Sequence, residues 1–60
     1  MSPSILVVED EAALLTLLRY NLEKQGFQVE EATDGQEALL RIAENKPDLV
    51  LLDWMLPSLS

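Results

Sequence analysis

Three acidic residues stand directly after two strongly apolar segments, and their side chains have the chemistry of a metal site. Residues 5–8 read ILVV and are followed by Glu9 and Asp10. Residues 49–52 read LVLL and are followed by Asp53. Carboxylates gathered in one place repel one another unless a cation lies between them. Oxygen donors without sulfur or imidazole favour a hard cation, so convergence of these acids would predict a Mg²⁺ site.

Each acid also has an ordinary structural explanation. Asp10 is a suitable N-cap for a helix that begins near Glu11, because a short acidic side chain accepts hydrogen bonds from the first helical N–H groups. Asp53 could equally be a solvated loop residue. Taken singly, these explanations are preferred; the metal hypothesis gains only if the fold brings the acids together.

The apolar pattern predicts three strands separated by two helices. Residues 5–8 and 49–52 lack alternation, which is typical of parallel strands covered on both faces. Residues 27–32 are more polar and predict an edge strand with charged gatekeeper side chains. The first helix ends near Gly26, and its apolar stripe recurs at helical spacing. That stripe consists of Leu14, Leu15, Leu18 and Leu22.

The second helix has clear start and stop signals. Asp34 followed three residues later by Glu37 predicts a capping box. Asn45 and Pro47 predict the end of the helix. Its expected apolar face consists of Ala38, Leu39, Ile42 and Ala43.

Alternation of strands and helices implies a parallel sheet. Right-handed crossovers, with the polar strand at an edge, give the strand order 2-1-3 and place the two helices on opposite faces. A crevice then opens between the carboxyl ends of the first and third strands, where open α/β sheets bind ligands. This topology brings Glu9, Asp10 and Asp53 together, which makes Mg²⁺ the preferred interpretation.

Composition excludes several classes of function. The 60 residues carry 11 acidic and four basic side chains, a net charge of −7, which disfavours direct binding to nucleic acid or to anionic membranes. Met1 to Ser4 lack the basic flank of a signal peptide. Apolar runs of at most four residues are far too short to span a membrane. With no cysteine, the sequence fits a reducing compartment, and we expect a cytoplasmic location.

Three segments together resemble one known family. They read ILVVEDE, ATDGQEAL and PDLVLLDWMLP. In this order they resemble the first half of the receiver domain of bacterial response regulators, and the likeness extends over residues 1–60. The form LLDWMLP is similar to the phosphate-regulon branch, in which a winged-helix DNA-binding domain follows the receiver. The resemblance implies a flavodoxin-like, doubly wound sheet, of which residues 1–60 supply the N-terminal β-α-β-α-β portion, without the rest of the receiver or an output domain.

The resemblance also implies roles for matching residues. Asp53 would accept a phosphoryl group from a sensor histidine kinase. Asp10 would bind Mg²⁺ directly, Glu9 would bind it through water, and Met55 would offer its backbone carbonyl. Such a protein is a self-dephosphorylating signalling switch in two-component transcription regulation, not a turnover enzyme. The full-length protein would form a homodimer and contact DNA only through its output domain.

Two other functions compete with this one. An aspartate-nucleophile phosphohydrolase of the haloacid-dehalogenase type needs a second Asp two residues after the nucleophile, where this sequence has Met55. A non-catalytic pseudo-receiver or interaction fragment would keep the fold and lose only the chemistry. The family's phosphoryl-sensing hydroxyl and its lysine would follow Ser60. Residues 1–60 alone would leave the last strand with a bare apolar edge, so we expect them to be unstable or to self-associate.

Overall fold

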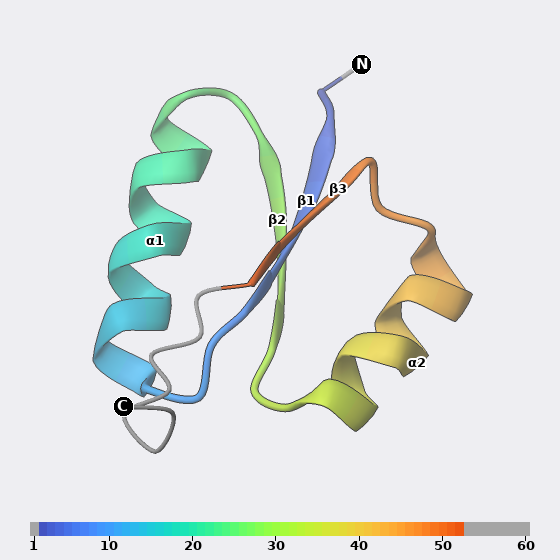
Figure 1. Ribbon diagram of the computed structural model, residues 1–60. Coiled ribbons are helices and arrows are strands. Elements are labelled where there is room, and N and C mark those ends of the chain that lie inside the picture. The colour runs from blue at the N-terminus through green and yellow to red at the C-terminus, as the bar shows by residue number, and fades with distance from the viewer. Residues whose placement is uncertain (1, 53–60) are drawn as a thin grey trace.

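The computed structural model describes residues 2–52 and shows the expected alternation of strands and helices (Figure 1). The elements are β1 (Ser4–Val8), α1 (Ala12–Lys24), β2 (Gln28–Ala32), α2 (Gly35–Asn45) and β3 (Leu49–Leu52). The first strand begins one residue earlier than predicted and the second one residue later. The order β-α-β-α-β is confirmed.

The three strands form one parallel sheet in the order β2-β1-β3. Val8 at the end of β1 is in register with Ala32 of β2 and with Leu52 of β3. Helices α1 and α2 lie on opposite sides of this sheet (Figure 1). The predicted strand order and doubly wound arrangement are therefore confirmed, and the carboxyl ends of all three strands lie at the same edge.

The core lies on both faces of β1, whose residues alternate between the two helices. Ile5 and Val7 pack with Leu15 of α1. Leu6 and Val8 pack on the other face with two alanines, Ala32 of β2 and Ala38 of α2. The side chains of β1 from Ile5 to Val8 are at most 4% exposed. A strand covered on both faces has no polar positions, which explains why ILVV shows no alternation.

Helix α1 packs three of the four leucines of the predicted stripe against the sheet, and the fourth, Leu14, is partly buried but does not belong to this cluster. Leu15 is buried, and Leu18 and Leu22 pack against the same cluster. The helix ends at the C-cap Gln25, and Gly26 follows with a φ of 96°. This left-handed conformation strains any residue with a Cβ, so glycine is favoured at this position.

The predicted apolar face of α2 is wrong in part. Ala38 is buried, whereas Leu39 is 69% and Ile42 is 37% exposed. Ala43 is exposed as well. Helix α2 packs over β1 and β2 and not over β3, so the side of the helix that faces away from those strands is left uncovered.

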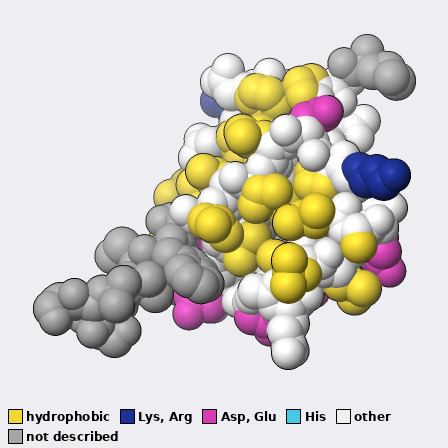
Figure 2. Space-filling view, turned by 45° about the vertical axis from the view of Figure 1, so that its right-hand side comes forward, with side chains coloured by type: hydrophobic (Ala, Val, Ile, Leu, Met, Phe, Trp, Pro, Cys, Tyr) yellow, Lys and Arg dark blue, Asp and Glu magenta, His cyan; other side chains and the backbone are white. Residues whose placement is uncertain are grey.

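These side chains belong to a broad apolar surface. Figure 2 shows hydrophobic side chains gathered over one face of the molecule. The large hydrophobic residues exposed on α2 and β3 are Leu39, Leu40, Ile42, Leu49 and Leu52. Within the described residues β3 pairs only with β1, so its other edge is bare as expected. The self-association that this surface favours stays a prediction.

The start of α2 is fixed by three hydrogen bonds, one accepted by Asp34 and two accepted by Glu37. The Asp34 carboxylate accepts a hydrogen bond from the Glu37 N–H at 2.8 Å, which confirms the cap. In return, the Glu37 carboxylate accepts from the Thr33 N–H at 2.8 Å and from the Thr33 hydroxyl at 3.1 Å. The return bonds thus reach one residue further back than in a capping box, where the N-cap N–H itself is the donor.

Loss of the Asp34 cap gives the first testable effect. We expect Asp34→Ala to lower the free energy of unfolding by about 1 kcal/mol, because the Glu37 N–H loses its acceptor. Asp34→Asn keeps an acceptor oxygen and should change the free energy by much less. Urea unfolding followed by circular dichroism measures both variants, and equal losses in the two would contradict a capping role.

Glu37 also makes the stability depend on pH. Hydrogen bonds from the Thr33 N–H, and then from its hydroxyl, hold the pKa of the Glu37 carboxyl below its ordinary value of 4.5. The stability that the ionised Glu37 carboxylate adds to the folded state is therefore fully present above pH 4.5. This stability is lost as the pH falls through the lowered pKa of the folded state. We expect Glu37→Gln to lose stability relative to the unmodified protein at neutral pH, and this difference should shrink in acid. A difference that is constant across the acid range would exclude this linkage.

Candidate functional site

The register of the sheet brings together the chain segments that carry the predicted site. Val8 and Leu52 are paired at the carboxyl ends of the neighbouring strands β1 and β3. Glu9 and Asp10 follow Val8 directly in the sequence, and Asp53 follows Leu52. Asp53 and Met55 lie outside the described residues, so their roles stay predictions. Of the predicted site residues, the described part of the chain contains Glu9 and Asp10.

Glu9 is the one fully buried acidic side chain among residues 2–52, at 1% exposed. Its backbone N–H donates to the carbonyl of Ala32, the last residue of β2, at 2.9 Å. One carboxylate oxygen accepts a hydrogen bond from the Glu11 N–H at 2.8 Å. Burial of a carboxylate is unfavourable unless it is paired. The sequence thus places an acid where the fold requires it to be held by specific partners.

The structure contradicts the prediction that Asp10 caps α1. Glu11 is the N-cap, with φ −96° and ψ 114°, and makes no side-chain capping bond. Its carbonyl accepts the first helical hydrogen bond, from the Leu15 N–H at 2.9 Å. Asp10 therefore stands one residue too early to cap the helix. Its side chain is exposed and makes no hydrogen bond or ion pair within residues 2–52, which leaves it available to a ligand.

The donor chemistry of this pair fits Mg²⁺. Glu9 and Asp10 are neighbours at a strand end and offer carboxylate oxygens only, the ligands that a hard cation prefers. The described part of the chain holds no group of three or more potential metal ligands, so this pair supplies part of the predicted donor set. The rest of that set, Asp53 and the Met55 carbonyl, lies beyond residue 52.

Both arginines of the described region form their ion pairs away from Glu9 and Asp10. Arg19 forms ion pairs with Glu23 at 3.1 Å and with Glu31 at 2.9 Å. Arg41 lies 3.6 Å from Glu37. The Arg19–Glu31 pair joins α1 to β2, whereas the Arg19–Glu23 and Arg41–Glu37 pairs lie within α1 and within α2.

Sequence reasoning missed the anchoring role of Glu9. Its spacing of two residues from Glu11 matches no capping pattern, because the usual acceptor is the N-cap residue itself. The signal that could have identified it is its position: an acid continuing a fully buried strand must find donors nearby.

A further finding concerns membranes: neither helix of the described residues is long and apolar enough to cross one.

Comparison with known proteins supports this reading of the fold. The family model for the response regulator receiver domain matches residues 5–60. The phosphate regulon transcriptional regulatory protein PhoB of Rhizobium meliloti is 58% identical over 60 residues, which is all of this chain and 26% of that protein. The alkaline phosphatase synthesis transcriptional regulatory protein PhoP of Bacillus subtilis is 54% identical over 59 residues, 98% of this chain and 25% of that protein.

A third relative, PhoB of Escherichia coli, is 51% identical over 57 residues, 95% of this chain and 25% of that protein. The chain thus spans about a quarter of the length of the curated relatives that it matches. The match of the family model covers nearly every residue, and the three-stranded sheet has the order 2-1-3 that this fold requires. The chain therefore belongs to the response regulator receiver domain family.

Proposed function

We propose that this chain is the N-terminal portion of a phospho-acceptor receiver of two-component signalling. In this role Asp53 accepts a phosphoryl group from a sensor histidine kinase with the help of Mg²⁺. The phosphorylated state then controls a DNA-binding output domain outside this sequence. Family membership supports the receiver role, and the names of the relatives as transcriptional regulatory proteins support the output.

The observation that carries this proposal is the pairing of Val8 with Leu52 at the end of two adjacent parallel strands. It makes the segment that begins at Glu9 and the segment that begins at Asp53 leave the sheet at the same edge. Glu9 is held there by the Ala32 carbonyl and by the Glu11 N–H. A buried acid fixed in this way and an exposed acid beside it suit a cation site that serves a nucleophile on the next strand.

The proposed reaction is a phosphoryl transfer between two side chains. A carboxylate oxygen of Asp53 attacks the phosphorus of the kinase phosphohistidine, an O–P bond forms, and the N–P bond breaks. The electron pair of that bond stays on the imidazole, which leaves as neutral histidine after it takes a proton from solvent. Bound Mg²⁺ would neutralise charge on the nucleophile and on the phosphoryl oxygens. Glu9 and Asp10 would provide carboxylate oxygens for this ion.

Mapping the modified residue tests this proposal. A complete receiver carrying this sequence is incubated with acetyl phosphate, with Mg²⁺ or with excess chelator, and its peptides are analysed by mass spectrometry. We expect phosphorylation at Asp53 alone and only when Mg²⁺ is present. Absence of modification under both conditions would favour the pseudo-receiver, and modification at another residue would disprove the assignment of the acceptor.

A further inference from the structure

Side chains from both helices lie along the outer edge of β2. Strand β2 lies at one edge of the sheet. The Gln28 N–H donates to the Pro3 carbonyl, and the Ala32 carbonyl accepts from the Glu9 N–H, both at 2.9 Å. Backbone N–H and C=O groups alternate in direction along a strand, so those of residues 28, 30 and 32 point toward β1. The backbone groups of residues 29, 31 and 33 therefore point away from the sheet.

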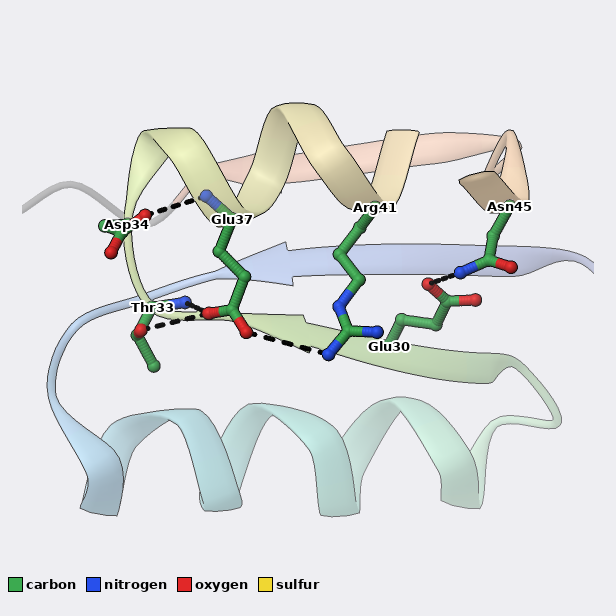
Figure 3. A network of polar contacts seen from close by, with 6 residues as sticks. All are labelled: Glu30, Thr33, Asp34, Glu37, Arg41 and Asn45. Atoms are coloured by element: carbon green, nitrogen blue, oxygen red, sulfur yellow. Dashed lines mark hydrogen bonds and ion pairs between the residues drawn. The ribbon is translucent and has the colours of Figure 1, made fainter. Parts of the chain in front are cut away.

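The outward N–H at the end of this row is already occupied. The Thr33 N–H donates to the Glu37 carboxylate at 2.8 Å, and the other carboxylate oxygen lies 3.6 Å from the Arg41 guanidinium. Figure 3 shows Glu37 and Arg41 reaching from α2 toward this edge. An added strand would need the Thr33 N–H for its own carbonyl, so it would have to displace this carboxylate.

Two further acids on β2 are held from opposite sides. Glu31 accepts a hydrogen bond from Arg19 of α1 at 2.9 Å. Glu30 accepts a hydrogen bond from Asn45 of α2 at 3.0 Å (Figure 3). Neighbouring side chains of a strand point to opposite faces, so each helix reaches one of the two acids. The charged groove that results, about 320 Å³ in volume, runs along the strand.

Among the described residues, the outer side of β3 carries no such acids. Strand β3 reads LVLL and carries no charged residue. Its side chains at Leu49 and Leu52 are more than half exposed. Within residues 2–52, the acids of the sheet therefore belong to β2 and not to β3.

We propose that Glu30, Glu31 and Glu37, with their helix partners, form an edge guard that prevents a further strand from adding to β2. An incoming strand would remove Glu37 from Thr33 and would separate Glu30 and Glu31 from Asn45 and Arg19. It would also cover carboxylates that now reach water. The guard acts through the folded structure and does not require phosphorylation, so its test is independent of the proposed function.

Sedimentation velocity of two matched variants tests the guard in a complete receiver carrying this sequence. Glu31→Ala/Glu37→Ala removes two carboxylates of the guard. Glu11→Ala/Glu44→Ala removes two exposed carboxylates that touch no member of the guard, one at the N-cap of α1 and one on α2, and leaves the edge of β2 intact. We expect the first variant to self-associate at concentrations about tenfold below those of the unmodified protein, the effect of about one lost hydrogen bond. The second should behave as the unmodified protein, and equal behaviour of the two variants would overturn the proposal.

Amide hydrogen exchange provides a second measurement that does not require the double variant to fold. In the unmodified receiver the Thr33 amide should exchange about tenfold more slowly than the Glu31 amide after correction for intrinsic rates, because only the former has an acceptor. Glu37→Ala should erase this difference, and Glu37→Gln, which keeps an acceptor oxygen, should retain it. A Thr33 amide that exchanges as fast as the Glu31 amide would show that the edge is open.

Discussion

Asp53→Asn is expected to lower the rate of phosphorylation of the receiver by at least about 10³-fold. Losses of this size are typical when an enzyme loses its nucleophile. The amide keeps the shape of the side chain but is a far weaker nucleophile than a carboxylate oxygen. The measurement is incorporation of phosphate from acetyl phosphate at saturating Mg²⁺. Asp34→Asn, at the cap of α2, is the matched control and should retain the full rate.

Asp10→Asn distinguishes loss of the nucleophile from loss of the metal. This variant keeps Asp53 but removes the negative charge of a proposed ligand, so Mg²⁺ should bind more weakly and the rate should recover as Mg²⁺ is raised. The Asp53→Asn rate should stay low at every Mg²⁺ concentration. Recovery of both variants, or of neither, would contradict the division of roles between the two acids.

Leu6→Ala is expected to have the largest effect on folding. Leu6 lies in the central strand, is fully buried, and packs with Val8 and Ala38. Truncation of such a side chain removes apolar contacts and leaves a cavity, at a loss of about 2–5 kcal/mol. That is a large share of the stability of a small domain, about 5–15 kcal/mol. Urea unfolding of a complete receiver would measure the loss.

The control for this prediction is Leu39→Ala on α2. Leu39 is 69% exposed, so the same truncation there should change the free energy of unfolding by less than about 0.5 kcal/mol. If Leu6→Ala loses as little stability as is expected for Leu39→Ala, then β1 is not the centre of the core. A Leu39→Ala loss as large as that of Leu6→Ala would mean that another part of the protein covers Leu39.

The fold was predictable because its determinants are local. The unbroken apolar runs of β1 and β3 mark buried parallel strands, and the charges in β2 mark an edge. With right-handed crossovers these facts leave little freedom in the strand order. Only the first residues of β1 and β2 differ from the prediction, each by one position, because the start of a strand depends on where pairing with its neighbour begins.

Details that depend on how the elements dock were not predictable. The cap at Asp10 was wrong because the chain turns one residue later, at Glu11. The exposure of Leu39 follows from the position of α2 over β1 and β2. The pair Arg19–Glu31 joins residues 12 apart and depends on the placement of α1 against the sheet. The Mg²⁺ site at Asp53 was reached from topology and resemblance, and it stays a prediction.

The two alanines in the cluster beneath α2 set a limit on side-chain size at that interface. Ala32 is fully buried and Ala38 is 6% exposed, and each contributes a single methyl group where the helix meets the sheet. Two methyl groups allow a helix backbone to approach a strand closely, and a branched side chain at either position would act as a wedge. The axis of α2 would then tilt outward, and the first turn of the helix would swing away from the strand ends that lie beside it.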